Sequence, residues 1–335
     1  MPQKPQRQQP LEHSGHAEIL IVGQAPDGFA IQTNKVFAHA QETILNNCLH
    51  QAGLIRAQVA MTNFVWDTVG ADKVWKAKRQ GRGGSHRIIG NIDGYKQSLW
   101  RIIQEVKPRV IVPLGDLPTY VLTKRDKTTA IRGYPFELAE TGIWVVPSLE
   151  PGKMVFSNHE WRWYLAHDLR KARRIAENSS VVTKWSDCKL IIPNNFSEAV
   201  ALLGEIAKHK LMAWDIEVSD FHTSCMGFCY QPKVGISIPT DMRWSEQEEQ
   251  WIWCKLAQIL EDDTIVKIVQ NGVFDVQFMY QELGIFVRNY VVDTMTGHHI
   301  MYPDFRKSLE FLASIHTFYP YWKDELGEKT IKDES

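Results

Sequence analysis

The sequence predicts an α/β protein with two domains, on the basis of two observations. Short apolar runs, each about as long as a buried strand, alternate with stretches long enough for helices, which is the pattern of α/β folds. The chain has 335 residues, of which 44% are hydrophobic and 23% charged. A single hydrophobic core rarely organises so many residues, so two domains are expected.

The first domain is expected at residues 17–178. Residues 1–16 are rich in Gln, Pro and His and indicate a disordered lead-in. Apolar runs typical of buried parallel strands follow, with helix-length stretches between them. The predicted strands are residues 18–23, 57–60, 110–114 and 143–147, and the predicted helices are residues 36–52, 95–106 and 158–177.

The second domain is expected at residues 186–335, after a linker at residues 178–180. It shows a second set of apolar runs and amphipathic stretches. The predicted strands are residues 190–192, 211–218, 234–239 and 265–270, and the predicted helices are residues 197–209, 245–260 and 272–283.

Charge is distributed unevenly between the two halves of the chain. Residues 1–180 hold 24 Lys and Arg against 16 Asp and Glu, whereas the remainder holds 14 against 23. A basic half is typical of a nucleic-acid binder. An acidic half is either an ordinary solvated surface or a source of metal-binding carboxylates.

Cysteine usage and hydropathy exclude several classes of protein. The five cysteines form no C-x-x-C pair, so the sequence indicates neither a disulfide framework nor a zinc or iron–sulfur site. No apolar run approaches the ~18 residues of a membrane helix, and the first ten residues lack the apolar core of a signal peptide. We therefore expect a cytoplasmic protein with no membrane partner.

The strongest chemical signal is the pair Asp215 and Glu217 in the predicted strand 211–218. Acids at i and i+2 on a strand point to the same face, and carboxylates gathered on an otherwise apolar strand need compensation by a positive charge. Asn271 and Asp275 form a second signal where the next strand ends and a helix begins. Asn271 suits the helix N-cap, and Asp275 shares its helix face. These oxygen ligands favour Mg²⁺ or Mn²⁺.

Residues 190–326 resemble the 3′→5′ proofreading exonuclease domain of family A DNA polymerases, especially the phage-type members. Asp215 and Glu217 match the first motif of that family, and Asn271 with Asp275 match the second. The stretch that follows matches at residues 293–295, 298–299 and 308–314. The resemblance implies a ribonuclease-H-like (DEDD exonuclease) mixed α/β domain that hydrolyses single-stranded DNA from its 3′ end with two metal ions. Asp215, Glu217, Asp275 and Asn271 would be catalytic, the three carboxylates would be the metal ligands, and Asp293 would order the backbone.

One family motif is missing from this resemblance. The family takes its last metal ligand from a later Y-x-x-x-D helix, whereas Tyr321 and Asp324 are one residue too close and Pro320 disfavours a helix there. We expect a domain truncated before its last motif, with the polymerase domain in cis or on a separate polypeptide. A shorter exonuclease with another fourth ligand is the alternative.

Residues 18–175 resemble the uracil-DNA glycosylase superfamily, in particular the family-4-like domains fused to some phage DNA polymerases. The residues that carry this resemblance follow the predicted strands, at 23–28, 63–65, 107–115 and 147–152. The resemblance implies a parallel-sheet glycosylase-like domain. In it the loop containing Gln24 would surround a flipped base and Asn63 would read its pyrimidine edge.

Two departures favour a degenerate glycosylase-like domain that binds DNA. Glu150 replaces the histidine of the last family loop, and the iron–sulfur cysteines of the stand-alone enzymes are absent. Residues 73–87 form a basic run that is expected to contact DNA phosphates. The side chains expected to make these contacts are Lys76, Lys78, Arg79 and Arg82. An active uracil-DNA glycosylase and a non-catalytic DNA-binding or scaffold subunit remain alternatives.

The two resemblances together imply the N-terminal module of a phage-type family A DNA polymerase. Such a module would proofread during DNA replication. It would work in the cytoplasm of a bacterial host.

Overall fold

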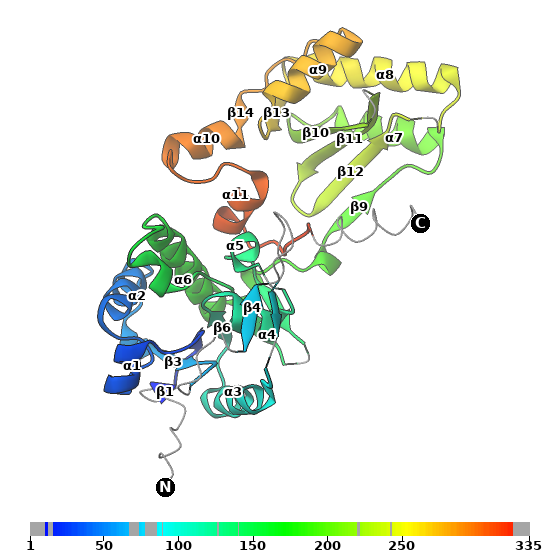
Figure 1. The fold of residues 1–335 in the computed structure, drawn as a ribbon. Coiled ribbons are helices and arrows are strands. Elements are labelled where there is room, and N and C mark those ends of the chain that lie inside the picture. Colours follow the sequence, from blue (N-terminus) through cyan, green and yellow to red (C-terminus); the bar gives the residue numbers. More distant parts are fainter. Residues whose placement is uncertain are drawn as a thin grey trace. The chain divides into compact units, whose positions relative to one another are not determined.

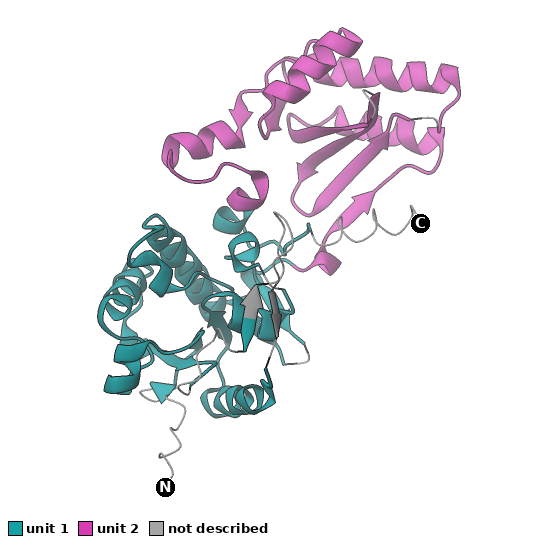
Figure 2. Cartoon of the chain, viewed as in Figure 1, with its two compact units in different colours: residues 1–183, 313–335 teal, residues 184–312 magenta. Residues whose placement is uncertain are grey.

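A computed structural model describes residues 11–12, 16–66, 74–77, 86–88, 90–125, 127–139, 141–219, 222–241 and 243–323. The chain divides into two compact units (Figure 2). Unit 1 comprises Met1–Thr183 together with Ala313–Ser335, and unit 2 comprises Lys184–Leu312. Within the described residues, no helix has both the length and the apolarity that crossing a membrane requires.

Unit 1 is built on a six-stranded sheet in the order β1-β3-β2-β6-β8-β7. The four inner strands are parallel, and the two edge strands run antiparallel to their neighbours. The inner strands are apolar and buried on both faces, as in other parallel sheets. The strands are β1 (Leu11–Glu12), β2 (Ile19–Gly23), β3 (Val59–Asn63), β6 (Val110–Pro113), β7 (Phe136–Leu138) and β8 (Ile143–Val145).

Helices cover both faces of this sheet. Helix α3 contributes to the same buried cluster as Leu20 and Val22, whereas α6 contacts β2 and β6 and lies beside α2 (Figure 1). The two strands β4 (Trp75–Ala77) and β5 (His86–Ile88) form a separate antiparallel ribbon. The helices are α1 (Gly28–Thr33), α2 (His39–Gln51), α3 (Asp93–Val106), α4 (Asp116–Thr123), α5 (Thr128–Ile131) and α6 (Trp161–Glu177).

Unit 2 has a mixed six-stranded sheet in the order β14-β13-β10-β11-β12-β9. Strands β10, β11 and β12 form an antiparallel meander, and β13, β14 and β9 add to it in parallel. The strands are β9 (Lys189–Ile191), β10 (Leu211–Ser219), β11 (His222–Gln231), β12 (Val234–Pro239), β13 (Val266–Val269) and β14 (Val292–Asp293).

The core of unit 2 lies on one face of this sheet. Met212, Trp214 and Ile216 of β10 are buried against apolar residues of α7, α8 and α9, so the alternate residues of β10 face the other way. The helices are α7 (Phe196–Ile206), α8 (Glu246–Glu261), α9 (Val273–Leu283) and α10 (Thr294–Met301), and α11 (Leu309–His316) begins in unit 2 and ends in unit 1.

The predicted fold class is confirmed: both units are α/β, the first around parallel strands and the second around a mixed sheet. Several elements were not expected from the sequence, among them β7, β14, α4, α10 and α11. Strand β11 was not expected, because its Gly, Cys and Thr residues give no apolar run. Residues 313–323, which the sequence places in the second domain of residues 186–335, lie in the compact unit 1.

Candidate functional site

The two acids of β10 lie on the face of the sheet that points away from the core of unit 2. Asp215 pairs with Gly227 across the β10–β11 ladder, and Glu217 pairs with Cys225. Both carboxylates line a groove of about 530 Å³ on this face. The register therefore confirms that Asp215 and Glu217 share one face.

Small residues make room for this groove. Gly227, Gly235, Ala213 and Ser237 line it together with the two acids. An added Cβ on Gly227 would come no closer than 3.9 Å to another heavy atom, the carbonyl oxygen of Asp215. The sheet surface beside the acids is thus open enough to receive another group.

Helix α9 brings a third carboxylate to the acids of β10. Strand β10 pairs with β13 only as far as Ala213, so its backbone beyond that residue has no ladder partner on this edge. Helix α9 follows β13, and the Asp275 Oδ1 atom accepts the backbone N–H of Ile216 at 3.4 Å. Asp275 is only 6% exposed. The Asp275 carboxylate is therefore held at Ile216, the residue that lies between Asp215 and Glu217 in the sequence.

Burial and neighbouring carboxylates raise the pKa values of Asp215 and Asp275. Burial raises the pKa of Asp215 to about 6, and the charges of Asp275 and Glu217 add to that effect. The pKa of Asp275 is also raised, first by burial, against the hydrogen bond from Ile216 and with the charges of Glu217 and Asp293. Mutual repulsion of this kind is what a bound cation would relieve.

Asp293 orders the backbone around Asp275, as the sequence predicts. One carboxylate oxygen accepts the N–H groups of Asn271, Met295 and Thr296, at 3.2, 2.8 and 3.2 Å. The other accepts the N–H of Gly272 at 3.1 Å. Asp293 is thus the N-cap of α10 and at the same time holds the residues that begin α9.

The predicted capping role of Asn271 is wrong. The N-cap of α9 is Gly272, and no side chain caps this helix. Asn271 has a left-handed backbone with φ of 58°, a conformation that asparagine tolerates better than most residues. Asn271 is exposed, and the catalytic role predicted for it stays a prediction.

Gln270 and Thr294 were not expected from the sequence, although both line the groove. The Thr294 hydroxyl donates to the Gln270 side chain and to the Val269 carbonyl oxygen. The Gln270 amide in turn donates to the Lys307 carbonyl oxygen at 3.0 Å. Gln270 is a polar residue at the end of an apolar strand, and this position was the signal that could have marked it as a site residue. Its partner Lys307 lies 37 residues away, so the sequence does not predict their contact.

The donors of this site fit a hard divalent cation. Asp215, Glu217 and Asp275 offer only carboxylate oxygens, which Mg²⁺ and Mn²⁺ prefer. Across the described ranges, no three His, Cys, Asp or Glu side chains stand close enough together to hold a metal ion.

In unit 1, Gln24 and Asn63 lie at the carboxyl edge of the sheet, where the sequence places them. Strands β2 and β3 pair Gly23 with Asn63, and an added Cβ on Gly23 would come within 2.2 Å of the Asn63 Oδ1 atom. The Asn63 amide donates to the Val36 carbonyl oxygen at 2.9 Å. The Gln24 side chain accepts the N–H of Leu117 at 3.3 Å.

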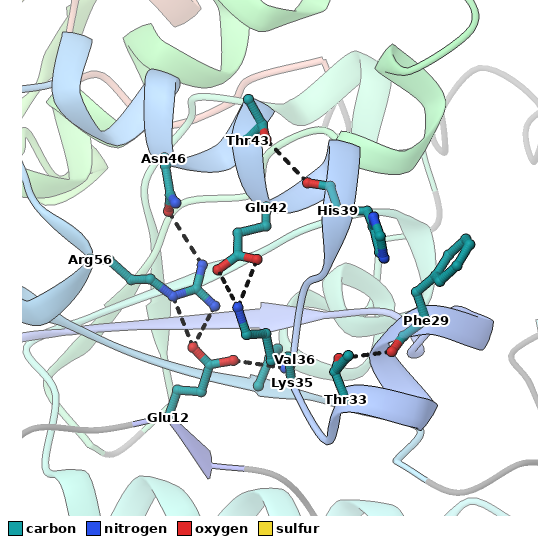
Figure 3. A network of polar contacts seen from close by, with 10 residues as sticks. All are labelled: Glu12, Phe29, Thr33, Lys35, Val36, His39, Glu42, Thr43, Asn46 and Arg56. Carbon is teal, nitrogen blue, oxygen red and sulfur yellow. Dashed lines mark hydrogen bonds and ion pairs between the residues drawn. The ribbon is translucent and has the colours of Figure 1, made fainter.

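The segment at Val36 is fixed from its other side by a polar network (Figure 3). Glu12 accepts the N–H of Val36 at 2.8 Å and also the guanidinium of Arg56, which reaches Asn46. Lys35 pairs with Glu42. The fully buried Asn63 therefore donates to a backbone segment that is itself held by hydrogen bonds.

Glu150 occupies the same edge. An added Cβ on Gly115 would lie 3.2 Å from the Gln24 Oε1 atom and 3.5 Å from the Glu150 Cβ atom. The pKa of Glu150 is raised by burial, which outweighs the opposing charge of Lys153, and Asp116 raises it further. A carboxyl group thus stands beside Gln24.

The predicted phosphate-contacting run is described only in part. The backbone of Lys76 belongs to β4. Lys78, Arg79 and Arg82 lie outside the described residues, as do Asp324 and the expected lead-in, apart from Leu11, Glu12 and His16.

Family models match both parts of the chain. Residues 11–170 match the uracil DNA glycosylase superfamily, and residues 191–329 match a 3′-5′ exonuclease family. The chain thus joins a uracil-DNA-glycosylase-like domain to a 3′-5′ exonuclease domain. The glycosylase-like match lies within unit 1, and the acids of β10 and α9 lie in the exonuclease match.

Several solved structures resemble parts of the chain at low sequence identity. The catalytic core of RRP6 from Trypanosoma brucei has 16% identity and a TM-score of 0.32, covering 42% of this chain and 41% of that one. The Nibbler EXO domain from Aedes aegypti has 14% identity and a TM-score of 0.27, covering 35% and 59%. The EXD2 exonuclease domain, soaked in Mn and GMP, has 14% identity and a TM-score of 0.27, covering 38% and 69%.

The chain spans about a third to three-fifths of the first solved structures that it resembles. A comparison with proteins of curated function gives no match.

Proposed function

We propose that this protein is a metal-dependent 3′→5′ exonuclease that acts as the proofreading module of a family A DNA polymerase during DNA replication, as in phage-type enzymes. The observation that carries the proposal is that Asp215 and Glu217 share one face of β10, while the Asp275 carboxylate accepts the N–H of Ile216 between them. The match to a 3′-5′ exonuclease family supports the same chemistry. The polymerase domain would follow in cis or be a separate polypeptide.

Each residue of the proposed site has a distinct role in metal binding, substrate contact or positioning. Asp215, Glu217 and Asp275 would hold Mg²⁺ or Mn²⁺, and Asn271 would contact the substrate beside them. Two such ions, when bound, supply an activated water and neutralise charge on the scissile phosphate. The N–H of Ile216 orients the Asp275 carboxylate, and Asp293 holds the backbone where α9 begins. Such orientation matters because nucleophile positioning is sensitive to small displacements.

The substrate would be a single-stranded 3′ end of DNA. The groove beside the acids is open and lined by small residues, so an unpaired strand can enter it. The last metal ligand would come from another helix, because the spacing of Tyr321 and Asp324 does not fit the Y-x-x-x-D motif.

The glycosylase-like unit would be a degenerate DNA-binding domain. Two observations support this proposal: Glu150 stands beside Gln24, and Asn63 is turned into a hydrogen bond with Val36. The phosphate contacts would come from Lys76, Lys78, Arg79 and Arg82.

A 5′-labelled single-stranded oligonucleotide tests the nuclease. The wild-type chain should shorten it from the 3′ end with Mg²⁺ or Mn²⁺. Asp275→Ala should reduce the rate by about 10²-fold or more, since a positioned charged group commonly contributes that much. The matched control is Glu282→Ala, which changes an exposed acid on the same helix and should leave the rate unchanged.

A parallel assay uses an RNA strand of the same sequence. Equal rates for wild type and Asp275→Ala would remove the proposed active site. Shortening of RNA alone would keep the nuclease and overturn the proofreading role.

A further inference from the structure

Unit 1 contains a buried charge cluster that neither candidate site uses. Arg132, Asp168 and Lys171 are each at most 5% exposed. The Arg132 Nε atom donates to both carboxylate oxygens of Asp168, at 3.1 and 2.9 Å, and the Ser148 hydroxyl donates to one of them at 2.6 Å. The cluster thus holds two cations for one carboxylate.

The surplus positive charge faces a segment that we call the strap, residues 313–322. The Lys171 ammonium donates to the carbonyl oxygens of Ser314 and of Thr317, the second at 2.6 Å. The Arg132 Nη1 atom donates to the Ser314 hydroxyl at 3.1 Å. These carbonyl groups lie where α11 ends, and the C-terminal end of a helix carries partial negative charge. Lys171 therefore caps α11 from a position far away in the sequence.

The rest of the strap lies on the same surface of unit 1. The Arg174 guanidinium stands over the Phe318 ring, 4.9 Å from its centre, and the N–H of Thr183 donates to the Phe318 carbonyl oxygen at 3.1 Å. The ring of the fully buried Tyr134 meets the ring of Tyr321 at a centroid distance of 5.2 Å. Both polar and aromatic contacts therefore hold the strap.

The backbone of unit 1 is shaped to receive this segment. Gly133 has a left-handed conformation with φ of 76°. An added Cβ there would come within 2.9 Å of the Ser314 carbonyl oxygen and 2.6 Å of the Asp168 Oδ1 atom. Only glycine avoids both the strain and the two close contacts.

The strap supplies the hydrogen-bond acceptors of the Lys171 side chain. A buried ammonium without acceptors is strongly unfavourable, and Asp168 is already bound by Arg132 and Ser148. The strap is also exonuclease sequence, since the exonuclease family match extends to residue 329. A glycosylase-like fold thus carries buried groups that are satisfied by the outgoing end of an exonuclease sequence.

We propose that the glycosylase-like unit is an intramolecular receptor for the strap, and that anchoring this segment is a function of the unit that needs no base excision. Helix α6 serves this purpose with Lys171 and Arg174. Two further cations of the helix, Arg170 and Arg173, donate to the carbonyl oxygens of Gln51 and Gly53. The basic face of α6 is therefore engaged within the protein rather than displayed to DNA.

Amide hydrogen exchange of the full chain, followed by mass spectrometry, tests the proposal without any activity assay. The reporting amides are those of Thr183, which donates to Phe318, and Thr317, which donates to Ala313. Lys171→Met should speed their exchange about tenfold or more, because a charged donor is removed from two buried acceptors. Gly133→Ala should act in the same direction. Arg170→Met, one position earlier on α6, should change neither amide.

The amides of β2 serve as the reference for global unfolding. Unchanged exchange at Thr183 and Thr317 in both Lys171→Met and Gly133→Ala, with β2 protected, would overturn the proposal. If either variant also exposes β2, Ser314→Ala decides the matter, because it removes only the hydroxyl partner of Arg132 on the strap. Faster exchange of Thr317 in that variant supports the receptor, and unchanged exchange contradicts it.

Discussion

The carboxylate of Asp293 accepts the backbone N–H of Gly272 at 3.1 Å, and this contact ties the beginning of α9 to the beginning of α10. Gly272 is packed tightly as well, since an added Cβ would lie 2.5 Å from the Val269 side chain. Asp275 lies one turn further along α9. Its position beside Asp215 therefore depends on Asp293, which stands outside the set of proposed ligands.

Replacing Asp293 should damage the nuclease by displacing Asp275. Asp293→Ala removes the acceptor of four N–H groups and should lower the free energy of unfolding by about 1–2 kcal/mol, as the loss of a helix cap does. It should also lower the exonuclease rate about tenfold, with weaker metal binding. Asp293→Asn keeps one acceptor oxygen and should be intermediate. Denaturant unfolding and metal-dependent rates measure both effects. A loss of stability with unchanged metal dependence would make Asp293 merely structural.

The acid positions could be predicted because they depend on short-range geometry. Asp215 and Glu217 are two residues apart on a strand, and this spacing alone puts them on one face. Asp275 follows an apolar run at the start of a helix, and its place next to that strand follows from the usual arrangement of a sheet. The pattern of apolar runs similarly predicted most of the strands and helices.

The failures are long-range. Asn271 is a residue type that often caps helices, but its N–H donates to Asp293, 22 residues later, and the N-cap of α9 is Gly272. The place of the strap in unit 1 is likewise a long-range feature, because in the sequence the strap follows the second domain. What holds it is Lys171, whose contact with Ser314 spans 143 residues.

Metal binding should weaken in acid because of the raised pKa of Asp215, about 6. The folded, metal-free site binds more protons than the unfolded chain between the ordinary pKa near 3.8 and this value. The metal-free protein should therefore gain stability from this group as the pH falls through 6, whereas the cation must displace the proton. We expect the apparent affinity for Mn²⁺ to fall by up to about tenfold per pH unit below about pH 6.

Isothermal titration at about pH 5 and about pH 7.5 measures this change, with proton release read from buffers of different ionisation enthalpy. The double variant Asp215→Ala/Glu217→Ala should lose binding at both pH values. Equal affinity of the wild type and the double variant would exclude these carboxylates as ligands.

DNA binding by the glycosylase-like unit should depend on salt through its basic run. Neutralising Lys76, Lys78, Arg79 and Arg82 should make the slope of log affinity against log salt shallower by up to about 3 for a single strand, since each phosphate contact contributes ~0.7. The matched control neutralises Arg170 and Arg173, whose guanidinium groups donate to backbone carbonyl oxygens. Fluorescence anisotropy over a salt series measures the slopes. A shallower slope in the control alone would place the DNA surface on α6.

Uracil excision should be undetectable in the wild-type chain. Glu150 places a carboxyl group beside Gln24, where the excision of uracil requires stabilisation of a developing anion, and one well-placed donor is commonly worth about 10²–10³ in rate. Cleavage of a uracil-containing oligonucleotide, followed on a gel after alkali treatment, measures the activity. Glu150→His should raise it by about 10²-fold if the acidic group is the main defect. If Glu150→His also fails to excise uracil, the buried Asn63 is a second defect of the site. Robust excision by the wild type would show an active glycosylase.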